Sequence, residues 1–201
     1  MKKVLVSQRI EKHHEYREYR DCIDQNWISL LELCNILPIL VPNNSVITKY
    51  IVKEIDYDGV ILTGGNDLSI FDDTYKQRDE TELILFTMAR EKEIPILGVC
   101  RGMQFIQNQF DVPLKSVSGH VQESQEVTIN GKVEIVNSYH NYGTNDTVES
   151  LDIWACSSDG VVKAVKHIDE PIIGIMWHPE RINPFRPEDI NLITSHFDIK
   201  N

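Results

Sequence analysis

The chain has 201 residues and a formal net charge of −11, with 41% hydrophobic and 25% charged residues. These proportions are ordinary for a globular protein, and the length suits one domain over residues 1–201. The negative charge argues against general binding to nucleic acid or to a membrane surface, since neither attracts an acidic protein. The first residues have too short an apolar run for a signal peptide, and the four cysteines form no CxxC pair. A cytoplasmic location is therefore expected.

Short apolar runs alternate with amphipathic segments in the first 110 residues. Alternation of this kind predicts βαβ units and a parallel sheet with helices on both faces. The expected strands are 3–7, 38–43, 58–65 and 95–100, and the expected helices are 16–35, 47–55, 81–92 and 101–110.

The second half changes character, because its strand patterns follow one another without long helices between them. Asn130-Gly131 separates two alternating runs within 126–136, which is a strong hairpin signal. Residues 153–180 indicate further strands, and 187–197 a closing helix. We therefore predict an α/β fold, a three-layer sandwich with a mostly parallel central sheet and antiparallel additions in the C-terminal half.

The stretch PILGVCRGMQFI (95–106) runs an apolar strand directly into a helix. Gly98 and Gly102 lie two residues on either side of Cys100. Small residues at these positions suit a sharp strand-to-helix turn, which lifts the central side chain out of the sheet. Cys100 is therefore predicted to present its thiol to a pocket. The other cysteines are interpreted as small core residues: Cys22, Cys34 and Cys156.

Other polar residues are expected at the carboxyl ends of neighbouring strands, where parallel sheets bind their ligands. His178 and Glu180 are two residues apart on a segment expected to be extended, so both would point the same way. With Cys100 they supply the thiolate, base and orienting acid of nucleophilic acyl transfer. The Gly64-Gly65 pair could supply a backbone N–H to an oxyanion or be a plain tight turn. A zinc site of Cys100, His178 and Glu180 also stays open, although a fourth ligand is not evident.

Four motifs, ILTGGNDL, GVCRGMQ, VNSYHN and IMWHPE, together resemble the class I glutamine amidotransferases. The match is closer to the stand-alone γ-glutamyl hydrolase branch, the peptidase C26 type, and covers nearly the whole chain. The resemblance implies that Cys100 is the nucleophile, His178 the base and Glu180 its orienting partner. It also implies an oxyanion hole from the backbone N–H groups of Gly65 and Arg101. The implied substrate-binding residues are Gly64, Gln104, Ser138, Tyr139 and His140.

The resemblance implies a small-molecule γ-glutamyl substrate and neither a cofactor nor a metal, and it leaves a homodimer open. Within the branch, the chain is similar to small hydrolases of bacterial capsule pathways that release a cytidine diphosphoramidate. Arg9, after the first strand, is the nearest basic residue to the crevice and is predicted to meet an anionic leaving group. Because acidic residues are interleaved with the basic ones, a solvated helical face is the alternative. The further basic residues are Lys12, His13, His14, Arg17 and Arg20.

Two other functions stay open. A glutaminase subunit would deliver ammonia to a separate synthase instead of releasing a larger amine. A cysteine redox sensor would use Cys100 without catalysis, but the His178–Glu180 pair argues against it.

Overall fold

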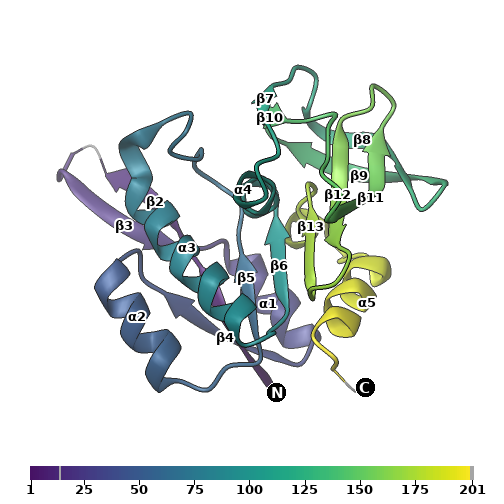
Figure 1. Cartoon of the computed structure of the whole chain (residues 1–201). Helices are drawn as coiled ribbons and strands as arrows, with labels where there is room; N and C mark the ends of the chain where they lie inside the picture. Colours follow the sequence, from purple (N-terminus) through teal and green to yellow (C-terminus); the bar gives the residue numbers. More distant parts are fainter. Residues whose placement is uncertain (14, 200–201) are drawn as a thin grey trace.

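The computed structural model describes residues 1–13 and 15–199 of the chain (Figure 1). Nine strands form the main sheet: β1 (Lys2–Ser7), β4 (Ile36–Val41), β5 (Gly59–Leu62), β6 (Ile96–Val99), β8 (Val121–Ile129), β9 (Lys132–Tyr139), β11 (Leu151–Ser157), β12 (Val162–His167) and β13 (Ile172–Ile175). The α-helices of this part of the chain are α1 (Gln25–Leu33), α2 (Ser45–Glu54), α3 (Lys76–Glu91), α4 (Arg101–Gln109) and α5 (Pro187–His196). Shorter elements are the strands β2 (Arg9–His13), β3 (Glu18–Cys22), β7 (Lys115–Ser116) and β10 (Tyr142–Gly143), and the 3₁₀ turns η1 (Asp73–Tyr75) and η2 (Pro179–Arg181).

The main sheet is parallel in one half and antiparallel in the other. Its strand order is β4-β1-β5-β6-β13-β12-β11-β8-β9. The pairs from β4 to β13 are parallel, and those from β13 to β9 are antiparallel. At the β8–β9 turn, Asn130 and Gly131 have φ angles of 49° and 80°, as a two-residue hairpin turn requires. The predicted mixed α/β sheet and the Asn-Gly hairpin are both confirmed.

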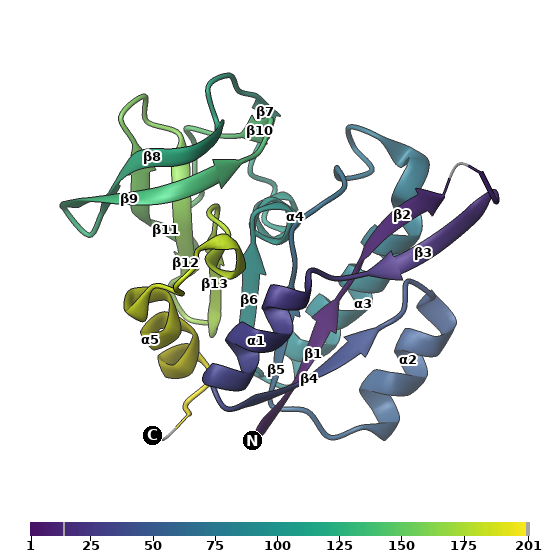
Figure 2. The ribbon, with the colours of Figure 1, turned by 180° about the vertical axis from the view of Figure 1, so that it is seen from behind.

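Helices cover both faces of this sheet. Figures 1 and 2, two opposite views, show α3 in front of the sheet on one side and α1 and α5 on the other. Two clusters of buried apolar residues correspond to these faces: one includes Trp27 of α1 and Ile193 of α5, the other Leu85 of α3 and Phe105 of α4. The predicted three-layer arrangement is therefore confirmed.

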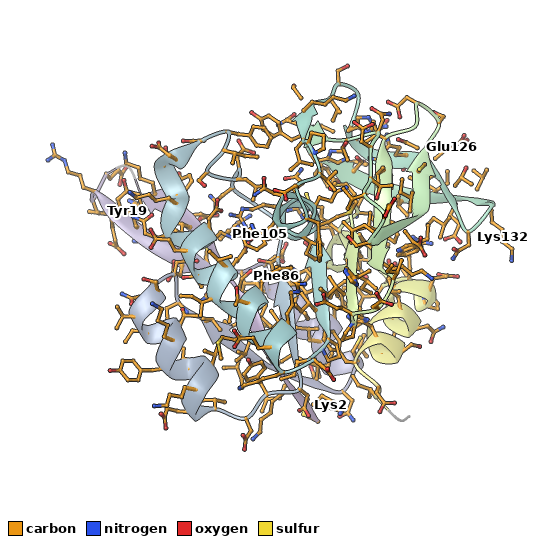
Figure 3. The ribbon with its side chains drawn as sticks, viewed as in Figure 1. Lys2, Tyr19, Phe86, Phe105, Glu126 and Lys132 are labelled. Carbon is orange, nitrogen blue, oxygen red and sulfur yellow. The ribbon has the colours of Figure 1, made fainter. Side chains whose placement is uncertain are left out.

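Side chains separate into an apolar interior and a polar periphery. Figure 3 shows Phe86 and Phe105 inside the molecule, and their rings meet edge to face at 6.0 Å. Lys2, Tyr19 and Lys132 lie at its outer edges. Within the residues that the structure describes, no helix combines the length and the apolar character needed to cross a bilayer.

The N-terminal segment corrects one prediction. The expected helix over 16–35 begins only at Gln25, where the Asp24 side chain accepts a hydrogen bond from the Asn26 N–H. Before it, β2 and β3 form an antiparallel hairpin. The helical spacing of apolar residues belongs to the later part of the segment, and the charged residues before it pair as strands. The alternative of a solvated helical face is therefore wrong about the helix but not about exposure. Apart from His14, which lies outside the described residues, the basic residues from Arg9 to Arg20 lie on this hairpin, and Lys12, Arg17 and Arg20 are exposed.

Candidate active site

The turn between β6 and α4 places Cys100 at the start of a helix. Cys100 has φ 53° and ψ −105°, a region that residues with a side chain rarely occupy. A Cβ on Gly102 would lie 2.0 Å from the Leu62 carbonyl oxygen, and one on Gly98 would lie 2.6 Å from Gly102. Only glycine at both positions lets the chain turn so closely. The sharp turn predicted from the sequence is confirmed.

His178 and Glu180 follow the carboxyl end of β13 and are hydrogen-bonded to each other. The distance from His178 Nδ1 to Glu180 Oε1 is 2.7 Å, and both side chains are buried. The expectation of an extended segment is wrong, because the 3₁₀ turn η2 begins at Pro179. The pairing therefore comes from a local turn.

The electrostatic surroundings of His178 favour its charged form. Burial opposes the imidazolium, but the Cys100 thiolate and the Glu180 carboxylate outweigh burial and raise the pKa of His178 to about 9. Within residues 1–13 and 15–199, His178 Nε2 has no close hydrogen-bond partner, and the Cys100 sulfur is the polar group near this imidazole. This nitrogen is therefore available to exchange a proton with a bound molecule.

Asn137, near the end of β9, holds the backbone of His178. Its amide nitrogen donates to the His178 carbonyl at 2.8 Å, and its amide oxygen accepts from the His178 N–H at 2.8 Å. This two-point contact fixes the chain that carries the imidazole. Asn137 belongs to the VNSYHN motif, but its position in that motif does not by itself predict this role.

A buried arginine, Arg78, holds the loop 63–67 that follows β5. Arg78 donates to the carbonyls of Thr63 (2.6 Å) and Gly65. Glu82 in turn accepts from Arg78 (3.0 Å) and from Ser7 (2.8 Å). These contacts fix the loop that carries the predicted oxyanion donor.

The Arg101 side chain belongs to the same buried network. Its guanidinium donates to Glu82 and Asp79 and is almost fully buried. Only the backbone of Arg101 remains to serve the predicted oxyanion hole.

A cavity of about 270 Å³ lies at the elbow, between the loop 63–67 and the segment after β9. Two carboxylates, Asp67 and Asp72, also line it. Six of the predicted site residues line this cavity: Gly65, Cys100, Arg101, Gln104, Tyr139 and His140. The structure thus brings together predicted residues from three separate parts of the chain.

Three predicted substrate-binding residues do not line the cavity. Gly64 packs behind it against the His178 ring, where a Cβ would lie 2.5 Å from Cε1. The Ser138 hydroxyl is buried and donates to the His120 carbonyl at 2.8 Å, so its side chain faces away from the cavity. Arg9 lies beside the loop, since a Cβ on Gly65 would be 2.9 Å from its Cδ, and it pairs with Glu11 at 2.5 Å.

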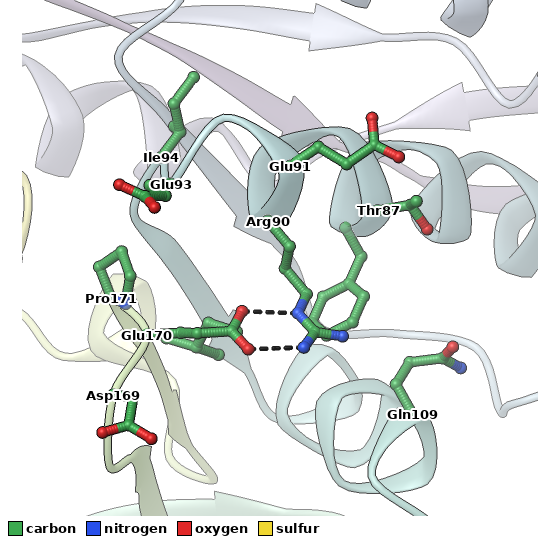
Figure 4. Close-up of a pocket in the computed structure, with 11 residues that line it drawn as sticks. Thr87, Arg90, Glu91, Glu93, Ile94, Gln109, Asp169, Glu170 and Pro171 are labelled. Atoms are coloured by element: carbon green, nitrogen blue, oxygen red, sulfur yellow. Dashed lines mark hydrogen bonds and ion pairs between the residues drawn. The ribbon is translucent and has the colours of Figure 1, made fainter.

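A larger cavity lies elsewhere. About 740 Å³ in volume, it lies beside the amino ends of β6 and β13, whereas Cys100 follows the carboxyl end of β6. Figure 4 shows Arg90 and Glu170 bonded across it, at 2.5 and 2.6 Å. Neither cysteine nor histidine lines it. The predicted site residues therefore lie outside this larger cavity.

The zinc alternative has no support from the geometry. In the part of the chain that the structure describes, no three His, Cys, Asp or Glu side chains group so that they could hold a metal ion. Cys100, His178 and Glu180 are therefore not arranged as a set of zinc ligands.

Comparison with known proteins identifies the family. Residues 17–197 match the model of the family described as Glutamine amidotransferase class-I. The chain belongs to the class I glutamine amidotransferase family. The resemblance found in its four motifs is therefore confirmed.

Relatives within the family differ in their described activities. The chain is 32% identical to a Campylobacter jejuni γ-glutamyl-CDP-amidate hydrolase, over 89% of this chain and 90% of that protein. It is 29% identical to a glutamine-hydrolyzing GMP synthase subunit from Methanothermobacter thermautotrophicus, over 70% and 74%. A solved structure of a candidate GMP synthase subunit from Thermoplasma acidophilum superposes with a TM-score of 0.72 at 18% identity, covering 99% of this chain and 94% of that one. This last likeness confirms the fold.

Gly64→Ala tests the contact between the loop and the histidine. The added Cβ would displace the imidazole, and a misplacement of about 1 Å in an active site costs roughly 100-fold in rate. We expect kcat for γ-glutamyl amide hydrolysis to fall by about that factor while circular dichroism stays unchanged. Gly131→Ala, in the β8–β9 turn, is the control, because it strains the backbone away from the site. Activity of Gly64→Ala within twofold of the wild type would contradict the contact.

Proposed function

We propose that the chain hydrolyses the γ-glutamyl amide bond of a small-molecule conjugate through a thioester on Cys100. One observation carries this proposal: a cysteine on a strained strand-to-helix elbow interacts with a buried histidine that is hydrogen-bonded to a carboxylate. These groups are the nucleophile, base and orienting acid that acyl transfer needs. Membership of the amidotransferase family and the 32% identical hydrolase support the same chemistry.

In the proposed mechanism, the Cys100 thiolate attacks the δ-carbonyl carbon of the glutamyl group. The backbone N–H groups of Gly65 and Arg101 stabilise the oxyanion of the tetrahedral intermediate, each contributing roughly 3–4 kcal/mol. The His178 imidazolium gives its Nε2 proton to the leaving nitrogen as the C–N bond breaks. Neutral His178 then takes a proton from water, hydroxide attacks the thioester, and the C–S bond breaks to release glutamate and the thiolate.

The raised pKa of His178 suits this sequence. With its pKa near 9, the imidazole is protonated at neutral pH and can act first as an acid. Glu180 holds Nδ1, so the proton that moves is the one on Nε2.

The charges around the cavity suggest how the two ends of the substrate are oriented. Asp67 and Asp72 suit the α-ammonium group of the glutamyl moiety and would repel a phosphate. Arg9 packs against Gly65, and its guanidinium, which would exchange its exposed partner Glu11 for the substrate, matches phosphate oxygens in pairs. The leaving amine is therefore proposed to lie toward Arg9. With the similarity to the γ-glutamyl-CDP-amidate hydrolase, this favours a cytidine diphosphoramidate destined for capsule modification.

A comparison of two substrates tests this assignment. We expect kcat/KM for γ-glutamyl-CDP-amidate to exceed that for a neutral γ-glutamyl alkylamide by at least about tenfold, or roughly 1.4 kcal/mol. Arg9→Ala should remove part of the advantage, and added salt should shrink it. Arg17→Ala, at the positive-φ turn of the same hairpin, is the matched control. Equal kcat/KM values for the two substrates would refute the nucleotide assignment. The proposal of a general γ-glutamyl amide hydrolase would remain.

A glutaminase subunit is the second candidate, favoured by the similarity to the glutamine-hydrolyzing GMP synthase subunit. Such a protein would hydrolyse glutamine itself and pass ammonia to a synthase. Strong glutaminase activity that appears only after a second protein is added would favour this candidate over the hydrolase.

A further inference from the structure

A lysine is buried behind the wall of the cavity. Lys163 of β12 is 1% exposed. Its ammonium contacts three acceptors: His140 Nε2 at 2.6 Å, His120 Nδ1 at 3.0 Å and Ser138 Oγ at 3.1 Å. A lysine ammonium has three N–H donors and no acceptor, so these contacts use all of them.

These contacts determine where the two histidines carry their protons. Since the Lys163 ammonium can only donate, the two imidazole nitrogens that face it must accept, so neither of these nitrogens carries a proton. His140 then carries its proton on Nδ1 and donates to the Tyr142 carbonyl at 2.8 Å. His120 carries its proton on Nε2, 3.0 Å from Asp159 Oδ2. The two rings stack with centroids 4.9 Å apart.

His140 connects this cluster to the cavity beside Cys100. The Tyr142 carbonyl that accepts from His140 also accepts from Gln104 Nε2 at 2.8 Å. The Tyr139 carbonyl lies 3.9 Å from Cys100 Sγ. Because His140, Tyr139 and Gln104 line the cavity, a change in the orientation of His140 would move the cavity wall.

We propose that Lys163 is a positioning residue that fixes the neutral Nδ1–H form of His140, and thereby holds the 139–142 wall against Gln104 and the nucleophile. The inference rests on the proposed function only for its effect on turnover, because the tautomer of His140 can be observed without any substrate. The family resemblance places His140 in the binding segment, whereas no motif in the sequence includes Lys163.

The pKa values of the two groups agree with this arrangement. Burial lowers the pKa of Lys163 to about 8, although Asp159 and Cys100 oppose that shift. Burial and the neighbouring Lys163 charge lower the pKa of His140 to about 3, and the charge of His178 adds to this shift. Below about pH 8 the Lys163 amine is protonated and donates to all three acceptors. As the pH rises through this value, one donor is lost and the wall loosens.

Nitrogen-15 NMR of histidine-labelled wild-type protein tests the tautomer directly. We expect His140 to stay neutral from pH 7 down to pH 5 and to carry its proton on Nδ1 throughout. A proton on Nε2, or titration of His140 with an ordinary pKa near 6.5, would overturn the proposal. This result does not depend on whether the substrate assignment is right.

Lys163→Met tests the consequence for the site, with Lys166→Met as control on the exposed part of the same strand. We expect Lys163→Met to raise KM for a γ-glutamyl amide by about tenfold, as for loss of one buried charged hydrogen bond, with a smaller change in kcat. We also expect kcat/KM of the wild type to begin to decline near pH 8, and in the variant only near pH 9, where His178 loses its proton. The proposal would be overturned if Lys163→Met changed neither KM nor the dependence of kcat/KM on pH above about 8. If the wild type hydrolyses no γ-glutamyl amide, the proposed function fails, and the NMR result, compared between the wild type and Lys163→Met, still decides whether Lys163 fixes the Nδ1–H form of His140.

Discussion

Replacing Cys100 by alanine is expected to lower the rate of glutamate release by at least about 10⁴-fold, the loss typical of removing a catalytic nucleophile. Alanine fits the elbow because it is smaller than cysteine and meets no new neighbour. The overall fold should therefore persist, and circular dichroism and the unfolding midpoint should stay close to those of the wild type. Glutamate release from a γ-glutamyl amide, followed with a coupled dehydrogenase, measures the effect.

Cys156→Ala is the matched control for this variant. Cys156 is a half-buried cysteine on β11, and β11 is separated from β6 by two strands of the sheet. Its replacement should leave the rate of glutamate release within about twofold, the range of a substitution outside the site. Comparable turnover by Cys100→Ala and the wild type would refute the proposed mechanism.

Glu82→Gln is expected to lower the free energy of unfolding by about 3–5 kcal/mol, as for removal of one partner from a buried charged network. Glu82 lies fully buried between the guanidinium groups of Arg78 and Arg101, so its neutral replacement leaves two buried cations short of a counter-charge. Urea unfolding measures the loss. Glu80→Gln, on the exposed side of the same helix, is the control and should change the free energy of unfolding by less than about 0.5 kcal/mol.

The pH dependence of this loss has a definite sign. Burial opposes the Glu82 carboxylate, but Arg101, Arg78 and Ser7 outweigh burial and hold its pKa below the ordinary value. A depressed carboxyl pKa stabilises the fold above the unfolded-state value, near 4.5, and this contribution is lost as the pH falls through the folded-state value. The difference between wild type and Glu82→Gln should therefore be full at pH 7 and shrink in strong acid. A difference below about 1 kcal/mol at pH 7 would contradict the role of Glu82.

The central part of the fold was predictable because local patterns determine it. The Asn130-Gly131 turn needs positive φ angles, and the glycines around Cys100 permit a close strand-to-helix turn. Both features follow from neighbours in the sequence. The hairpin over 9–22 was missed because its charged residues give a weak period, and the helical spacing further along the chain dominated the prediction.

The residues that hold the site in place were not predictable, because their contacts join segments that lie far apart in the sequence. Asn137 holds His178 across 41 positions of the chain, and Arg78 supports the loop 63–67 from α3. Lys163 reaches His120 and His140 from β12. A single sequence shows that these residues are polar, but burial and pairing between distant segments appear only in the folded chain.

Mass spectrometry of the enzyme quenched during turnover tests the central proposal most directly. The protein is mixed with γ-glutamyl-CDP-amidate, stopped in acid within milliseconds, digested and mapped. We predict a glutamyl adduct on the peptide that carries Cys100, labile to hydroxylamine as a thioester is, and no adduct in Cys100→Ala. Glutamate release by the wild type with every cysteine unmodified throughout the time course would contradict a thioester mechanism.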